Sequence, residues 1–277
     1  MPTIAEKRET FRKLHQSGCF ALPNPWDIGS ACYLQHLGFE AIATSSAGFA
    51  FSRGLPDNAV ALDTMLAHLH ELVDATDIPV NADFENGYAN DITELTNNVK
   101  LCVATGVAGL SIEDATGDKE KPLYELSHAV ERISAAREAI GISGAMLVGR
   151  AECFLVGQPD IDEVIRRLTA YAEAGADCLY APGIETADHI AAVVGAVAPK
   201  PVNLLVSGPG GMTLNQAAKL GVRRVSVGGA LARAAWGGFM QAATRLASDG
   251  TFAGFAQTAS FRELNEFFRE DATRRAR

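Results

Sequence analysis

Eight short apolar segments recur along this chain, with amphipathic stretches between them. The intervening stretches, such as "PDIDEVIRRLTAYAEAGA", place apolar residues at three- and four-residue intervals, which is typical of helices that face a core. Several stretches end in a glycine just before the next apolar segment, as in "LGFEAIA" and "AGADCLY", where a left-handed residue can close a helix. The apolar segments are residues 19–27, 40–46, 79–85, 109–115, 145–152, 177–183, 201–208 and 223–229.

The apolar segments are too hydrophobic to be strands with one face in water, so they belong in a parallel sheet covered by helices. Eight strand–helix units in fewer than 240 residues predict an α/β fold, a single closed (β/α)8 TIM-type barrel. A doubly wound open sheet is the alternative, but no G-x-G-x-x-G opens a helix after the first strand. We expect one domain over 1–277, with the barrel at about 17–232 and additional C-terminal helices at about 233–277.

The C-terminal segment is helical from about Ala230 onward. Its last part, "FRELNEFFREDATRRAR", carries Phe261, Leu264, Phe267 and Phe268 on one side. This is more helix than a barrel requires. The apolar side could pack against another subunit or cap the chain's own barrel.

Composition narrows the possible partners and the compartment. The net charge is −9 and the only basic patch is the terminal "RRAR", which argues against nucleic acid as a partner. No apolar run approaches the ~20 residues that span a bilayer, and "MPTIAEKRETFRKLHQ" lacks the apolar core of a signal peptide. Five cysteines without a C-x-x-C pair suit a reducing cytoplasm. We therefore expect a cytoplasmic protein without membrane or nucleic-acid partners.

Acidic side chains follow three consecutive predicted strands. In "PVNADFENGY", alternate positions hold Asn81, Asp83 and Glu85, which point the same way along a strand. Because barrel enzymes carry their chemistry at the carboxyl ends of the strands, we expect Asp83 at the mouth and Glu85 just above it. The next strand ends in "SIEDA", which brings Glu113 or Asp114 beside them. Helix capping would explain any one of these acids, but their recurrence favours a site.

The fifth predicted strand adds a positively charged side chain to this mouth. It ends in "GRAE", where Arg150 and Glu152 share one face. Several carboxylates repel one another unless a cation lies among them, and Mg²⁺ (or Mn²⁺) prefers oxygen ligands. Arg150 would then hold a carboxylate of the substrate. A metal and an arginine together suit a small 2-oxo or 2-hydroxy acid, whose enolate the cation stabilises.

At these residues the chain resembles the isocitrate lyase/phosphoenolpyruvate mutase superfamily over nearly its whole length, from "NPWDIGSA" through "GRAECFLVG" to "GVRRVSVGG". The superfamily's second-strand loop appears as "TSSAGFAFSRGLPD", and its fourth-strand "IED" is intact. The third-strand motif, D-x-D-T-G-[YF], appears as "NADFENGY". We interpret this as Asn81 replacing the first acid and Glu85 replacing the threonine. The resemblance implies a Mg²⁺-dependent enzyme and a homo-oligomer, either a dimer or a tetramer.

The resemblance also implies a metal site and a carboxylate site. Ser45 and Ser46 would offer hydroxyl and backbone N–H groups to the substrate carboxylate. Asp83 would be the principal metal ligand, with Glu113 acting directly or through water. Glu85 would be a further ligand if it restores the charge lost in the motif, unless it points away.

Further residues receive roles at the substrate. Arg150 would hold the substrate, and Asn203, at the end of the seventh strand, is a weaker candidate. Tyr180 on the sixth strand could reach the mouth and donate a hydrogen bond. Asp57 would sit near the reacting centre, although it could be only the N-cap of the following helix. The glycine-rich "SGPGG" at 207–211 is either a phosphate cradle or a tight turn.

The loop after the fourth strand decides between reactions. Superfamily lyases that split isocitrate or 2-methylisocitrate carry a catalytic cysteine in a K-K-C-G-H segment, whereas this loop reads "ATGDKEKPLYEL". We expect a carbon–carbon lyase acting on a small 2-oxo or 2-hydroxy dicarboxylate through a pyruvate-type enolate, by decarboxylation of oxaloacetate or a retro-aldol step. One alternative is P–C chemistry on a phosphonopyruvate-type substrate, with Lys119 and Lys121 folding over the site. Another is a barrel that binds a metabolite without turning it over.

Overall fold

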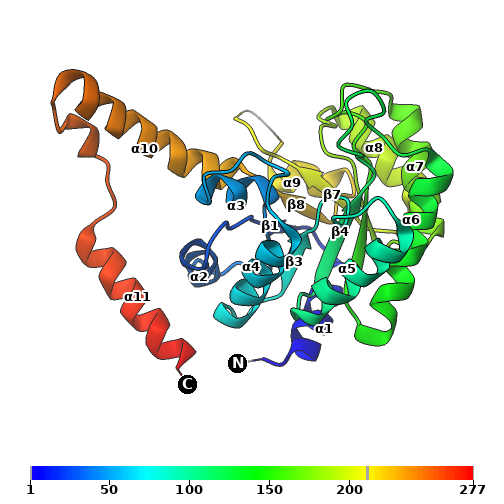
Figure 1. The fold of residues 1–277 in the computed structure, drawn as a ribbon, viewed down its shortest axis with the longest axis horizontal. Coiled ribbons are helices and arrows are strands. Elements are labelled where there is room, and N and C mark those ends of the chain that lie inside the picture. The colour runs from blue at the N-terminus through cyan, green and yellow to red at the C-terminus, as the bar shows by residue number, and fades with distance from the viewer. Residues whose placement is uncertain (1, 210–211, 277) are drawn as a thin grey trace.

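The structure, a computed structural model, describes residues 2–209 and 212–276, so part of the glycine-rich 207–211 segment lies outside the described residues. Eight parallel strands form one sheet in the order β1-β8-β7-β6-β5-β4-β3-β2 (Figure 1). Each strand lies inside one of the eight predicted segments. The strands are β1 (Phe20–Leu22), β2 (Ile42–Ala43), β3 (Val80–Asp83), β4 (Gly109–Glu113), β5 (Met146–Arg150), β6 (Cys178–Tyr180), β7 (Val202–Leu205) and β8 (Arg224–Ser226).

Hydrogen bonds at the ends of β1 and β2 bring the two edges of the sheet together. The Ala43 N–H donates to the Pro23 carbonyl at 3.0 Å, and the Asn24 amide donates to the Thr44 carbonyl at 2.8 Å. The sheet is therefore a nearly closed barrel. The predicted (β/α)8 barrel is confirmed, and the doubly wound alternative is wrong.

Helices follow the strands and cover the outside of the barrel (Figure 1). Most begin with a side-chain cap, such as Asp91 and Asp160, whose carboxylates accept backbone N–H groups of the first turn. No described helix is both long enough and apolar enough to cross a bilayer. The helices are α1 (Ile4–Leu14), α2 (Ile28–His36), α3 (Ser46–Ser52), α4 (Leu62–Ala75), α5 (Ile92–Ala104), α6 (Leu126–Ile140), η1 (Gly141–Ser143), α7 (Ile161–Glu173), α8 (Ala187–Val197), α9 (Leu214–Lys219), α10 (Ala230–Asp249), η2 (Ala253–Phe255) and α11 (Phe261–Arg275).

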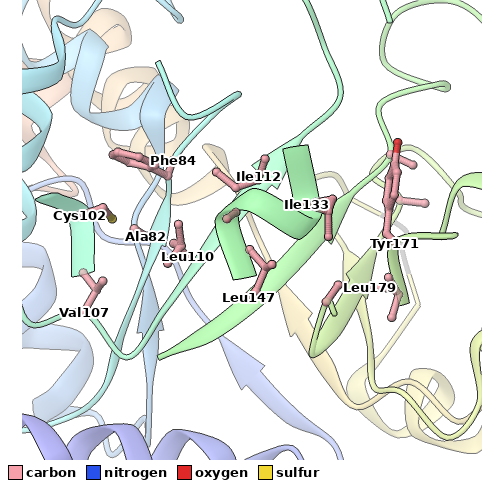
Figure 2. Packing of buried hydrophobic residues seen from close by; sticks show 14 of the residues in the cluster. Ala82, Phe84, Cys102, Val107, Leu110, Ile112, Ile133, Leu147, Tyr171 and Leu179 are labelled. Carbon is pink, nitrogen blue, oxygen red and sulfur yellow. The ribbon is translucent and has the colours of Figure 1, made fainter. Parts of the chain in front are cut away.

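Alternation along the strands separates the packed shell from the barrel interior. Outward side chains such as Leu110 and Leu147 are fully buried in a cluster that also holds Ile133 of α6 and Tyr171 of α7 (Figure 2). The intervening positions point inward, where polar groups gather. These inward side chains include Asn81, Asp83, Ser111, Arg150, Tyr180, Asn203, Arg224 and Ser226, all of which line one cavity. The strands therefore build both the core and the site.

Helix α1 closes the amino-terminal end of the barrel. Arg8 donates to the Val107 and Val103 carbonyls at 3.0 and 2.8 Å, and Phe11 is fully buried against the barrel floor. A Cβ at Gly109 would lie 2.9 Å from Phe11 and 2.8 Å from the Asn81 amide oxygen, so only glycine lets the helix approach this closely. Among the described residues, α1 therefore covers the end of the barrel opposite to the carboxyl ends of the strands.

The turn after β3 depends on Gly87. This residue has φ +77°, and an added Cβ would lie 2.2 Å from Leu95 Cδ1. We expect Gly87→Ala to reduce the free energy of unfolding by about 2–4 kcal/mol, through left-handed strain and overpacking together. Gly54 is the matched control, because it has φ +72° with nothing within 4 Å, so Gly54→Ala adds strain alone. Urea unfolding measures both, and equal losses would contradict the packing contribution.

The predicted additional C-terminal helices are present. Helix α10 starts at Ala230 and projects away from the sheet, and α11 follows it back (Figure 1). The end of α11 packs on the chain's own barrel, because the Phe267 ring lies 5.3 Å from Tyr33 and Arg274 forms an ion pair with Asp77. Phe261, at the start of α11, is 84% exposed. Helix α11 therefore packs on the chain's own barrel toward its C-terminal end, whereas its first residue is exposed.

Candidate active site

Two connected cavities lie at the carboxyl end of the strands. The inner cavity has a volume of about 150 Å³ and extends down into the barrel, and the outer cavity, of about 550 Å³, lies above it. Ser46, Asp57 and Arg150 line both, so they form the neck between the two. Lys119 lines the outer cavity, whereas Lys121 lines neither. A small acid can therefore enter from the lysine-bearing loop and reach the barrel interior.

Arg150 is the centre of the acidic cluster at the neck. Its Nη1 lies 3.1 Å from both Asp83 Oδ1 and Glu113 Oε2, and its Nε donates to Glu152. Its guanidinium also lies 5.2 Å above the Tyr180 ring. Burial alone would lower the pKa of Arg150, but the surrounding carboxylates outweigh it and raise that pKa well above its usual value. The guanidinium predicted to hold the substrate is thus already shared among three protein carboxylates.

Asp83 ends β3 at the neck, as predicted. Its Oδ2 accepts both the backbone N–H and the hydroxyl of Ser46, each at 3.0 Å, and its own N–H donates to Thr44 Oγ1 at 2.8 Å. The Ser45 hydroxyl accepts the Gly48 N–H at 3.1 Å, which caps α3. Both predicted carboxylate-binding serines therefore lie at the site, and their hydroxyls have protein partners.

Glu85 does not lie above Asp83, so that part of the prediction is wrong. The strand ends at Asp83, and Glu85 has φ +48°, which breaks the alternation. Its buried carboxylate accepts the Tyr88 hydroxyl at 3.0 Å and lines neither cavity. Burial raises the pKa of Glu85 to about 7.

The alignment of the superfamily's acidic motif with this chain must also change. The glycine that the motif requires is Gly87, where φ is +77° and an added Cβ would lie 2.2 Å from Leu95 Cδ1. Counted back from Gly87 and Tyr88, the pattern D-x-D-T-G-[YF] places its two acids on Asp83 and Glu85. Our interpretation that Asn81 replaces an acid is therefore wrong. Asn81 lies deeper in the barrel, where it is 3% exposed.

The structure also resolves the choice at the end of β4. Glu113 faces the neck, whereas Asp114 points outward and accepts hydrogen bonds from Arg167 and Tyr171. Burial raises the pKa of Glu113 well above its usual value, although Arg150 opposes this shift.

The remaining predicted residues all line the inner cavity. Asp57 is exposed at the neck and does not cap α4, whose N-cap is Ala61. Tyr180 is buried, and burial raises its pKa to about 12, so its hydroxyl keeps its proton. Asn203 donates to Ser226 Oγ at 2.9 Å and accepts the Arg224 Nε–H at 2.9 Å.

Sequence reasoning missed a cavity-lining arginine and the histidine that contacts it. Arg224 of β8 is 3% exposed, and His15 follows α1 directly beneath it. Alternation from Ser226 could have placed Arg224 inside the barrel. Nothing in the local pattern marks His15, because its position depends on how α1 docks.

His15 is held neutral by its surroundings. Its Nδ1 donates to the Phe11 carbonyl at 2.7 Å, so its Nε2 is left to accept from Arg224 Nη1 at 3.3 Å. Burial, helped by the charges of Arg224 and Arg223, lowers the pKa of His15 to about 3.

This buried histidine predicts a pH-dependent loss of stability. Because the folded pKa of about 3 lies below the ~6.5 of an unfolded histidine, the unfolded state binds the proton first as the pH falls. The stabilisation is complete above about pH 6.5 and is lost progressively toward pH 3. Between pH 7.5 and 5 we expect a loss of about 2 kcal/mol that His15→Gln removes. Urea unfolding of both proteins at both pH values measures the difference, and parallel losses would contradict it.

The acidic cluster fits a hard divalent cation by charge and donor type. One guanidinium faces the carboxylates of Asp83, Glu113 and Glu152, and burial raises the pKa of the last two. Within residues 2–209 and 212–276, no three acidic, histidine or cysteine side chains converge to enclose a metal. A Mg²⁺ ion does not need such an enclosure, because it keeps several waters beside one or two carboxylates.

The fold and this mouth define a (β/α)8 barrel with a small, acid-lined site, and comparison with known proteins identifies its family. A family model described as phosphoenolpyruvate phosphomutase matches residues 11–247. The chain therefore belongs to that family, within the isocitrate lyase/phosphoenolpyruvate mutase superfamily of lyases and mutases, and is an enzyme of that superfamily.

Three relatives illustrate the range of the superfamily. A lyase- or mutase-like protein of Burkholderia cenocepacia J2315 has a TM-score of 0.93 and 48% identity, covering 96% of this chain and 97% of its own. An oxaloacetate decarboxylase of Paraburkholderia xenovorans (strain LB400) is 30% identical over 212 residues, 73% of this chain and 69% of its own. A phosphonopyruvate hydrolase solved with oxalate and Mg²⁺ has a TM-score of 0.85 and 26% identity, covering 97% and 96%.

Proposed function

We propose that this enzyme is a Mg²⁺-dependent carbon–carbon lyase that acts on a small 2-oxo or 2-hydroxy dicarboxylate. The observation that carries the proposal is the neck, where Asp83, Glu113 and Arg150 meet above an inner cavity of only about 150 Å³. Such a volume suits an acid of a few carbons. The relative that decarboxylates oxaloacetate supports this choice of substrate class.

The metal would be held chiefly by Asp83, with Glu113 acting directly or through water. Mn²⁺ could take the place of Mg²⁺, since both prefer oxygen donors. When bound, the cation would supply the positive charge that stabilises an enolate as it forms. Glu85 lines neither cavity and accepts the Tyr88 hydroxyl instead, so it is not part of this proposed metal site.

The chain's own residues would position the acid and balance its charge. Ser45 and Ser46 line the inner cavity and would anchor the carboxylate next to the 2-oxygen. Arg150 would hold the acid at the neck, and Asp57 would lie near the reacting centre. Decarboxylation of oxaloacetate would break the bond from C3 to C4, release CO₂ and leave the electron pair on an enolate of pyruvate. Tyr180, which keeps its proton, would donate a hydrogen bond to this species.

A proton NMR time course tests the proposal. The panel is oxaloacetate, 2-methylisocitrate, dimethylmalate and phosphonopyruvate, each with Mg²⁺ and with EDTA. We expect EDTA-sensitive formation of pyruvate or another cleavage product, faster than with the metal alone. Silence from the whole panel with Mg²⁺ and with Mn²⁺ would contradict the lyase.

A second candidate is P–C chemistry on a phosphonopyruvate-type acid. The position of Lys119 on the outer cavity favours it, because an ammonium group there can meet a phosphonate at the entrance. The similar fold of a phosphonopyruvate hydrolase is consistent with this. Consumption of phosphonopyruvate alone in the NMR panel would select this candidate.

We also propose that the protein is a cytoplasmic homo-oligomer, a dimer or a tetramer. Helix α10 projects from the barrel (Figure 1). Its side chains Phe239 and Met240 are about 60% exposed, and Trp236 is 40% exposed. These side chains bury little apolar surface within one chain, and a second copy would cover them. All five thiols are free, which suits a reducing compartment. Analytical ultracentrifugation of wild type and Phe239→Glu tests the assembly, and a monomeric wild type would contradict it.

A further inference from the structure

Arg224 places a buried positive charge at the deep end of the inner cavity. It begins β8, pairs in register with Asn203 of β7 and is 3% exposed. Its side chain lines the cavity together with Asn81 and Ser226. The barrel interior therefore holds a cation well below the acidic neck.

The described residues leave this cation without an anionic partner. Its Nε donates to Asn203 Oδ1 at 2.9 Å, and its Nη1 contacts His15 Nε2 at 3.3 Å and Asn81 Oδ1 at 3.4 Å. All three acceptors are neutral. Among residues 2–209 and 212–276, no carboxylate lies within 4.0 Å of the guanidinium, and its Nη2 has no hydrogen-bond partner.

Other buried arginines are satisfied differently. Arg150 contacts three carboxylates, and Arg167 contacts Asp114 and Glu163. Arg132 lacks a carboxylate partner, but it donates to backbone carbonyls outside both cavities. Burying a charge without a counter-charge is costly, so a guanidinium with free N–H groups on a cavity favours an anion within it. Arg224 is thus better placed than Arg150 to receive a charged group of the substrate.

We propose that Arg224 binds the second carboxylate of the substrate and makes the site selective for dicarboxylates. This rests on the proposed function, which places the first carboxylate and the 2-oxygen at Ser46 and Asp83. Asp83 and Asn81 are two residues apart on β3, a rise of about 6–7 Å along the strand. That separation suits a four- or five-carbon diacid lying along the barrel axis, with its distal end at Arg224.

Isothermal titration with two stable 2-hydroxy acids tests this role. Malate and 2-hydroxybutyrate differ by a distal carboxylate in place of a methyl group, and each is titrated with Mg²⁺ present. We expect wild type to bind malate at least tenfold more tightly than 2-hydroxybutyrate. Arg224→Met should bring this ratio close to one, by weakening malate alone.

A second variant guards against a folding defect in Arg224→Met. Asn81→Asp keeps the size of the side chain and places a carboxylate beside Arg224 Nη1, which neutralises the cation within the protein. Asn81→Asp should abolish the preference for malate over 2-hydroxybutyrate, as Arg224→Met should. Arg132→Met is the matched control, since it removes a buried guanidinium that lines neither cavity and should keep the wild-type ratio.

The outcomes separate this inference from the proposed function. An unchanged ratio in folded Arg224→Met or Asn81→Asp overturns the role of Arg224, even if wild type cleaves an acid in the NMR panel. A wild type that shows no preference for malate overturns it as well. A ratio that depends on Arg224 supports the anion site, even if the panel shows no turnover and the lyase fails.

Discussion

Asp83→Asn is expected to lower kcat for the preferred acid by about 10³-fold or more, with little change in stability. The substitution keeps the size of the side chain and an oxygen acceptor for the Ser46 N–H, so the neck should keep its shape. It removes the negative charge that Arg150 and the proposed metal both require. Turnover by NMR and metal affinity by titration would fall together.

An aspartate outside the site is the control for this substitution. Asp188 lies exposed in the first turn of α8 and lines neither cavity, so Asp188→Asn should keep the wild-type rate. Thermal denaturation establishes that both variants fold. Wild-type turnover in a folded Asp83→Asn protein would rule out Asp83 as the principal metal ligand.

Asp114→Ala is expected to cause the largest loss of stability, about 3–5 kcal/mol. The Asp114 carboxylate is 3% exposed, accepts the Tyr171 hydroxyl at 2.6 Å and Arg167 Nη1 at 3.0 Å, and also accepts the Glu152 N–H at 2.8 Å. Truncation to alanine removes the carboxylate that accepts from the Arg167 guanidinium, the Tyr171 hydroxyl and the Glu152 N–H. Because a domain is stable by about 5–15 kcal/mol, much of that total is at stake. Urea unfolding measures the loss.

An exposed ion pair gives the contrast for Asp114. Glu9 contacts Arg12 at 2.8 Å, but both side chains are nearly half exposed, so Glu9→Ala should cost less than about 1 kcal/mol. Tyr171→Phe removes one partner of Asp114 and should cost an intermediate amount. A loss of under 1 kcal/mol in Asp114→Ala would show that this network does not hold β4 to α7.

The strands and the site end of the barrel could be predicted because their signals are local. Apolar runs and helical periods mark all eight strand–helix units, and alternation places Asp83 and Arg150 at the strand ends. The alternation rule failed at Glu85. Strand β3 ends at Asp83, and the backbone is left-handed at Glu85, two residues further on. Alternation holds only while the chain stays extended.

The amino-acid sequence by itself determined the fold class, the family and most of the acids and the arginine at the neck. Only the tertiary structure decided how their charges are shared. It directs Asp114 outward into a packing network, commits Arg150 to three carboxylates and leaves Arg224 facing the cavity beside a neutral His15. The physical reason is that a strand pattern sets which way a side chain points, whereas the balance of buried charges depends on residues from distant parts of the chain.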